Sequence, residues 1–272
     1  MEDFTIAIYC FIDDYLKIKN RKESSKRKSS DAEIITTALI AARYFGGNYA
    51  KARLYLKEVH KFNFPDKSNF SRLLNKLSNT ISSIFFGLGQ SLKKLNTDSE
   101  YLIDSFPVTV CRNIRIPRCK LLKHEAYRGK NASKREYFYG FKVQIITTKD
   151  GIPVEYFLSA GSYADITAFK SMNIDLPPGS KLYGDSGYTD YEFEDSYKEL
   201  EQIHLLIVRK SNSKRKDHPS LTFLKNYMRK RIEITFSEIT NFFPRKIHAI
   251  TAQGFILKIV LFIFAFTIDK IL

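Results

Sequence analysis

The stretch Tyr-Leu-Ile-Asp-Ser at residues 101–105 and the stretch Leu-Tyr-Gly-Asp-Ser-Gly-Tyr at residues 182–188 decide the fold. Each is an apolar, strand-like run with one aspartate at its end, Asp104 in the first and Asp185 in the second. A third acid, Glu233, lies in a basic stretch whose apolar residues recur every four positions, as in a helix. Three carboxylates that a fold brings together can hold divalent metal ions against a phosphodiester. DNA strand cleavage and transfer is therefore the leading hypothesis.

Apolar runs of strand length recur after Asp98, and helix-like segments separate the later ones. Strands are expected at 101–110, 137–148, 154–160, 181–184 and 203–208, and helices at 166–172, 193–201, 221–243 and from 252 onward. Lys149-Asp150-Gly151 is a hairpin turn between the second and third strands. Three strands, a helix and then alternating strands and helices predict an α/β domain over residues 98–272. Its mixed sheet is flanked by helices, as in a ribonuclease-H-like domain.

Residues 1–97 are predicted to form a small all-α region that precedes this domain. Ser-Asp-Ala-Glu at 30–33 is typical of a helix start, and Gly46-Gly47 of a helix end. The segment 68–77 resembles a capped helix with a basic polar face. It is either the recognition helix of a helix-turn-helix unit or one member of a plain helical bundle, and the sequence alone favours the bundle. The region is a candidate for DNA binding.

The positive charge of the chain, +15 in total, is concentrated beside the candidate acids. Residues 111–135 carry nine Lys or Arg and one acid, and residues 209–231 carry nine and one acid. Such clustering is expected of a protein that binds a polyphosphate such as nucleic acid, although most charge runs are solvated loops. The candidates for phosphate contacts are Arg112, Arg115, Lys120, Arg128, Lys130, Lys142, Arg209, Lys214, Arg215 and Arg229.

Several classes of protein are disfavoured. Three cysteines without a Cys-x-x-Cys pair indicate neither a disulfide framework nor a structural zinc site. The sequence has no His-Glu-x-x-His pattern and no glycine loop of the kind that cradles ATP phosphates. The N-terminus lacks the features of a signal peptide. The uncharged stretch 259–268 is shorter than the roughly 20 residues that span a bilayer, so it predicts a buried core helix and a cytoplasmic protein without membrane contact.

Each acid also has an ordinary structural interpretation. Asp104 could cap a strand end, but burying an ion among apolar neighbours is costly unless a cation compensates it. Asp185 lies in common turn chemistry, although its flanking glycines permit close approach of a ligand. Glu233 could form a surface ion pair with Arg229 one turn earlier. Glu238 on the same helix is the alternative third acid.

The ordered motifs resemble the DDE transposases of bacterial insertion sequences, most closely the IS982 family within the IS4-like superfamily. The matching segments are 101–116, 126–130, 138–142, 182–188, 229–237 and 243–255. The resemblance implies a ribonuclease-H-like fold with Asp104, Asp185 and Glu233 as the catalytic and metal-binding triad. It implies Mg²⁺ or Mn²⁺, with two ions, as cofactor.

The same resemblance implies double-stranded DNA as partner, namely the terminal inverted repeats of an element and a target. Pairing two DNA ends makes a homodimer or a larger assembly the expected state. Two alternatives stay open: a nuclease of the same fold that cuts without rejoining, and a catalytically inactive DNA-binding descendant. An RNA-binding protein is less favoured, because no aromatic-rich RNA-binding pattern is present.

Overall fold

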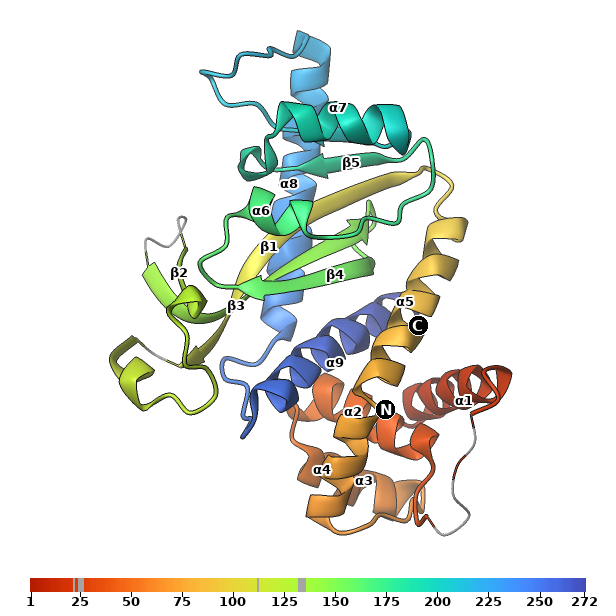
Figure 1. The fold of residues 1–272 in the computed structure, drawn as a ribbon. Coiled ribbons are helices and arrows are strands. Elements are labelled where there is room, and N and C mark those ends of the chain that lie inside the picture. The colour runs from red at the N-terminus through yellow and green to blue at the C-terminus, as the bar shows by residue number, and fades with distance from the viewer. Residues whose placement is uncertain (22, 24–26, 112, 132–135) are drawn as a thin grey trace. The chain divides into compact units, whose positions relative to one another are not determined.

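The computed structural model describes residues 1–272 except 22, 24–26, 112 and 132–135, and the chain divides into two compact units. We call residues 1–87 together with 242–272 the helical unit, and residues 88–241 the sheet unit (Figure 1). This division differs from the boundary expected between residues 97 and 98, because the C-terminal residues group with the N-terminal helices.

The helical unit is built around α2, which is buried along most of its length. Its described helices are α1 (Glu2–Ile18), α2 (Asp31–Phe45), α3 (Tyr49–Val59), α4 (Lys67–Lys76), most of α5 (Ser78–Leu95) and α9 (Ala252–Ile271). Ser30 and Glu33 form a capping box at the start of α2, and Gly46 ends it with a left-handed φ of 55°. Both predicted ends of this helix are therefore confirmed. The predicted helix at 68–77 corresponds to α4, which Asp66 caps.

The apolar C-terminal stretch forms α9, and its residues 259–268 are all buried. Within the helical unit α9 packs against α2, and the Phe262 ring stacks near Phe243 at 5.2 Å between centres. A helix that is apolar on every side is stable only when it is surrounded by protein or lipid. The predicted core helix is confirmed, and no described helix is long and apolar enough to cross a membrane.

The sheet unit contains a mixed six-stranded sheet in the order β2-β3-β1-β5-β6, with β4 paired to β3. Its strands are β1 (Glu100–Cys111), β2 (Arg128–Asn131), β3 (Glu136–Thr148), β4 (Pro153–Ala160), β5 (Lys181–Gly184) and β6 (His204–Ile207). β1 runs antiparallel to β3 but parallel to β5, and β5 runs parallel to β6. The sequence predicted five of these strands and missed β2.

Helices cover both faces of the sheet (Figure 1). They are α6 (Asp165–Lys170), α7 (Tyr191–Leu200) and most of α8 (Pro219–Phe242), with short 3₁₀ helices η1 (Asn113–Arg118), η2 (Glu125–Tyr127) and η3 (Ser186–Tyr188). Ile103 of β1 belongs to a core cluster with Phe169 of α6. Phe106 points to the opposite face, where its ring lies 6.4 Å from that of Phe236 on α8. The predicted α/β class, a mixed sheet flanked by helices after an all-α region, is confirmed.

Candidate active site

Asp104 and Asp185 lie next to each other because their strands are parallel neighbours. In the β1–β5 pairing Ile103 stands opposite Gly184. The next residue along each segment is an aspartate, so Asp104 and Asp185 are neighbours. A Cβ on Gly184 would lie 2.9 Å from Ile103 Cγ2 and 3.0 Å from Ile207 Cδ1. The sequence suggested that a ligand could approach the backbone closely beside Asp185. At Gly184 it is instead side chains of the neighbouring strands that come this close. The two acids meet where β5 ends and β1 continues.

Backbone amides hold both carboxylates. The amide of Ser105 donates a hydrogen bond of 2.7 Å to Asp104 Oδ1, and the amide of Ser186 donates one of 2.6 Å to Asp185 Oδ1. Asp185 is also the residue that caps η3. A carboxylate fixed by a neighbouring amide has lost rotational freedom before any ligand arrives, which favours an ordered binding site.

The electrostatic environment of Asp104 is strongly negative. The pKa of Asp104 is raised to about 7, chiefly by burial and also by the charges of Asp165, Asp185 and Glu233, while the hydrogen bond from Ser105 lowers it. Acids that follow β5 and that lie on α6 and α8 therefore all act on one carboxyl of β1. This concentration of acids is the electrostatic feature that a bound cation would relieve.

Glu233 comes to this region from α8, on the face of the sheet toward which Asp104 points. Asp104 has the same orientation along β1 as Phe106, which contacts α8. The Glu233 side chain is 64% exposed, and its Oε1 lies 3.3 Å from Arg229 Nε. The surface ion pair that the sequence suggested for Glu233 is thus present, and the charge of the same glutamate also raises the pKa of Asp104. Glu233 is thus an acid of α8 that raises the pKa of Asp104.

Asp165, a fourth acid that the sequence did not single out, lies on the opposite face of β1. Ser105 Oγ donates a 2.6 Å hydrogen bond to Asp165 Oδ1, and Lys142 Nζ lies 3.2 Å from the same oxygen. Gln144 donates a 3.0 Å hydrogen bond to the Asp165 carbonyl. In the sequence Asp165 only precedes a predicted helix, and nothing in that pattern connects it with Asp104. The one signal in the sequence was the place of this acid at the start of a helix, where it is the first residue of α6.

The donor set suits a divalent cation in its chemistry, because Mg²⁺ and Mn²⁺ bind carboxylate oxygens. However, no three His, Cys, Asp or Glu side chains among the described residues are arranged closely enough to hold a metal ion. Glu233 is paired with Arg229. An exposed i,i+4 pair of this kind is worth roughly 0.2–0.5 kcal/mol, so rotation of Glu233 toward the two aspartates costs little.

The side chains predicted to contact DNA differ in their surroundings. Arg115, Lys120, Lys130 and Lys214 are exposed, and Arg112 is outside the described residues. Ion pairs join Arg128 to Glu125, Lys142 to Asp165, Arg209 to Glu194, Arg215 to Asp195 and Arg229 to Glu233. Because Lys142 and Arg209 are only 14% and 13% exposed, their positive charge is used within the protein. Contact of these side chains with DNA stays a prediction.

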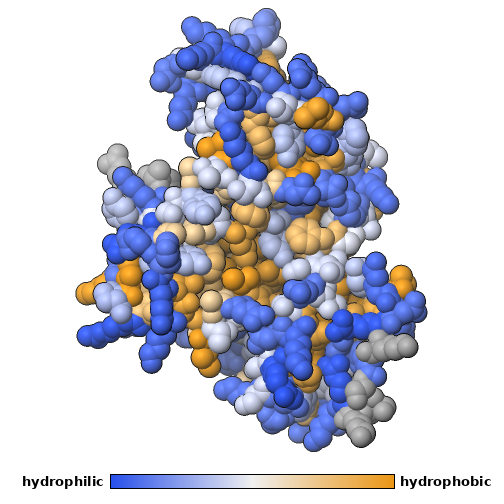
Figure 2. Space-filling view, viewed as in Figure 1, coloured by the Kyte–Doolittle hydropathy of each residue, from blue (hydrophilic) through white to orange (hydrophobic). Residues whose placement is uncertain are grey.

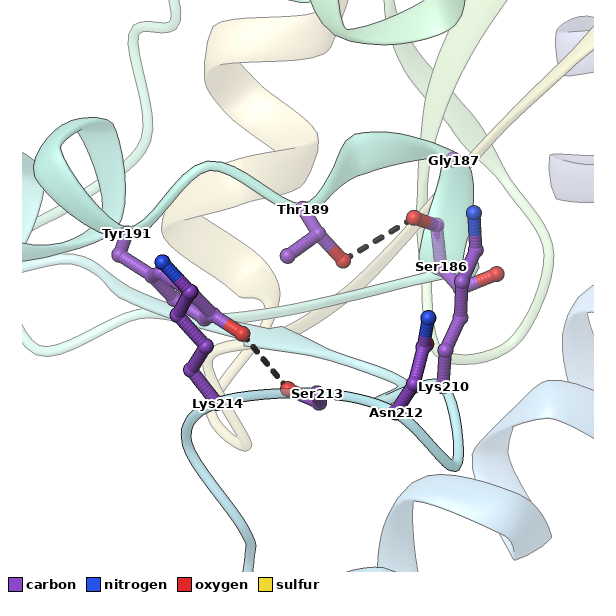
Figure 3. A pocket seen from close by; sticks show the side chains of 8 residues that line it. All are labelled: Ser186, Gly187, Thr189, Tyr191, Lys210, Asn212, Ser213 and Lys214. Atoms are coloured by element: carbon purple, nitrogen blue, oxygen red, sulfur yellow. Dashed lines mark hydrogen bonds between the residues drawn. The ribbon is translucent and has the colours of Figure 1, made fainter.

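A pocket lined by residues with polar side chains and one glycine adjoins Asp185 (Figure 3). It lies between η3 with the segment that follows and the loop that joins β6 to α8, and it encloses about 460 Å³. The lining residues are Ser186, Gly187, Thr189, Tyr191, Lys210, Asn212, Ser213 and Lys214. The surface over α7 and this loop, at the top of Figure 2, is predominantly hydrophilic. Sequence reasoning named Lys214 but did not anticipate the pocket, which depends on two segments more than twenty residues apart.

A sequence profile of the family described as Transposase DDE domain matches residues 94–252, more than half of the chain. The chain belongs to the transposase DDE domain family. The matched region contains Asp104, Asp185 and Glu233, so all three candidate acids of this DDE-domain protein lie within it. No curated protein and no solved structure gives a significant match. The predicted resemblance to DDE transposases is confirmed at the level of the family, and the mixed sheet agrees with a ribonuclease-H-like DDE domain.

Proposed function

We propose that the protein is the transposase of an insertion sequence, of the IS982 type, that cuts DNA at the ends of its element and joins the freed 3′ ends to target DNA. One observation carries the proposal: Asp104 and Asp185 each follow directly on the paired residues Ile103 and Gly184 of the parallel strands β1 and β5, inside the DDE-domain match. The charge of Glu233 acts on the same Asp104 carboxyl, which supports Glu233 as the third acid.

Asp104, Asp185 and Glu233 would hold two Mg²⁺ or Mn²⁺ ions. When bound, these ions activate the attacking oxygen and stabilise charge on the leaving oxygen of the phosphodiester. Asp104 is partly protonated near neutral pH in the metal-free protein, because its pKa is raised to about 7. Its carboxyl gives up that proton as a cation binds, and the amides of Ser105 and Ser186 keep the two aspartates oriented.

The Lys142–Asp165 pair balances charge beside the reacting groups. Lys142 Nζ also donates a 2.9 Å hydrogen bond to the Tyr163 carbonyl, which fixes the ammonium close to Asp165. Ser105 contacts Asp165 through its hydroxyl and Asp104 through its amide, so it connects the two acids. In the proposal Asp165 positions β1 at Asp104 and does not bind substrate.

The proposed partner is double-stranded DNA. Residues 1–97 would bind the terminal inverted repeats and residues 98–272 would act on the strands, with a homodimer or larger assembly pairing two ends. The basic segments around 111–135 and 209–231 belong to the second of these regions and supply most of the excess charge. Binding through phosphates makes affinity dependent on salt and only weakly dependent on sequence outside the repeats.

A strand-transfer assay tests this function. A labelled genomic fragment that contains the reading frame and its flanking DNA is incubated with the protein and Mg²⁺ or Mn²⁺, then resolved on a denaturing gel. We expect metal-dependent products both shorter and longer than the input strands, because joining of a freed 3′ end lengthens its target strand. EDTA is expected to remove both classes.

The other outcomes separate the rival functions. Shorter products alone would identify a nuclease that does not rejoin strands. DNA binding without new products in either metal would identify an inactive descendant. Either result would contradict the proposed transposase activity while leaving the family assignment intact.

A further inference from the structure

The pocket beside Asp185 has a rigid frame. On one side η3 follows directly from Asp185, and Thr189 Oγ1 donates a 3.0 Å hydrogen bond to the Ser186 carbonyl. On the other side Tyr191 Oη lies 2.6 Å from Ser213 Oγ, which ties the start of α7 to the loop before α8 (Figure 3). The pocket is therefore held in place by the same segment that positions one of the candidate catalytic acids.

Two arginines near the pocket form ion pairs within the protein. Arg209 is paired in a bidentate manner with Glu194, and Arg215 with Asp195, so α7 neutralises both. Their guanidinium carbons lie 5.1 and 4.7 Å from the centre of the Tyr191 ring. The aromatic face that could stack on a DNA base is thus already covered by cations.

Two lysines have a different position. Lys210 and Lys214 are exposed, and neither forms an ion pair within the described part of the chain. Figure 3 shows the Lys210 side chain rising from the loop toward Ser186, with Asn212 beside it, and the Lys214 side chain extending toward Tyr191. Two ammonium groups and an amide, beside the hydroxyl of Ser186, form a cluster of hydrogen-bond donors with no acid among the lining residues.

We propose that this pocket binds a phosphodiester of the DNA strand that lies against Asp185, with Lys210 and Lys214 as the phosphate ligands and without contact to a base edge. The inference rests on the proposed function, which places a DNA strand beside Asp185. Lysine acts on phosphate as a point charge, and phosphate contacts fix the register of a strand while carrying no sequence information. The pocket would hold the backbone in line with the acids.

Equilibrium binding in EDTA tests this inference with Lys210→Ala/Lys214→Ala. Each phosphate contact on duplex DNA contributes about 0.9 to the slope of log affinity against log salt, so the slope is expected to fall by roughly 2. Between about 50 and 200 mM salt the double variant should lose roughly tenfold less affinity than the unmodified protein. The change should be equal for related and unrelated DNA sequences, and Lys210→Arg/Lys214→Arg should restore the slope.

The control is Lys94→Ala/Lys198→Ala, which removes two exposed lysines of the sheet unit that lie outside both basic windows. A salt slope for the pocket variant equal to that of this control would overturn the inference, as would an effect confined to one DNA sequence. Failure of the proposed function gives a different result. In that case the unmodified protein binds DNA, and the pocket variant shows the reduced salt slope, yet the unmodified protein forms no cleavage or transfer products.

Discussion

Asp104→Asn or Asp185→Asn is expected to lower metal-dependent strand cleavage by at least about 10³-fold, and Glu233→Gln by a similar factor. Loss of a carboxylate ligand removes several kcal/mol of charge stabilisation, and each 1.36 kcal/mol corresponds to a factor of ten in rate. Duplex binding in EDTA should stay the same or strengthen slightly, because none of these changes removes a positive charge and each can only reduce the negative charge near the phosphates. Cleavage rates and binding isotherms measured on one DNA fragment check both expectations.

Asp150→Asn provides the matched control for these variants. Asp150 lies in the β3–β4 turn of the sheet unit with its side chain 81% exposed, and asparagine suits a turn equally well. The control should cleave at the rate of the unmodified protein. Full activity in any one of the three active-site variants would remove that residue from the triad and make Glu238 the next candidate on α8.

The second large effect is an increase in the stability of the metal-free protein on Asp104→Asn at alkaline pH. The pKa of Asp104 is about 7 in the fold, above its ordinary value of 3.8, so folding favours the protonated form. Below about pH 3 the carboxyl is protonated in both states and has no differential effect. As pH rises from about 4 to about 7, the folded state binds more protons than the unfolded state, so stability is lost, and above about pH 7 the loss is complete.

Asparagine carries no charge at any pH, so the variant avoids this loss. The free energy of unfolding of Asp104→Asn should exceed that of the unmodified protein by roughly 2–4 kcal/mol at pH 8 and by only about 1 kcal/mol at pH 4.5. Urea unfolding in EDTA at the two pH values measures the difference, and Asp150→Asn should show no such dependence. A variant less stable than the unmodified protein at pH 8 would show that Asp104 is not in a negative, buried environment.

Most of the sheet was predictable because its strands are apolar runs bounded by turn signals. Residues 137–148 and 154–160, for example, flank the hairpin turn at Asp150-Gly151 and form β3 and β4. β2 was missed because Arg-Gly-Lys-Asn at 128–131 contains no apolar pattern. It exists through its backbone pairing with one end of β3, a contact that the local sequence does not encode.

The two aspartates of the site were predictable for a related reason. A carboxylate at the end of an apolar run stands out locally, and parallel β1 and β5 then place the two next to each other. The contacts of Asp165 with Ser105 and Lys142 were not predictable, since they join residues 23–60 positions apart in the chain. The grouping of α9 with the N-terminal helices likewise depends on tertiary packing.

The use of the basic segments 111–135 and 209–231 could not be predicted from the sequence either. Composition alone identifies where positive charge gathers, but it cannot tell a cation that pairs internally from one that is available to DNA. Arg209 and Arg215 are held by acids of α7, while Lys210 and Lys214, in the same loop, have no such partner in the described chain. The distinction required the position of α7 relative to that loop.

Metal-directed cleavage of the polypeptide tests most directly whether the three acids share one cation. Fe²⁺ bound in place of Mg²⁺, with ascorbate and peroxide, produces hydroxyl radicals that cut the chain beside the ion, and mass spectrometry locates the cuts. We expect cuts near residues 104, 185 and 233 that disappear with excess Mg²⁺ and in Asp185→Asn. Cuts that spare any one of these segments, or that persist in Asp185→Asn, would contradict a shared metal site.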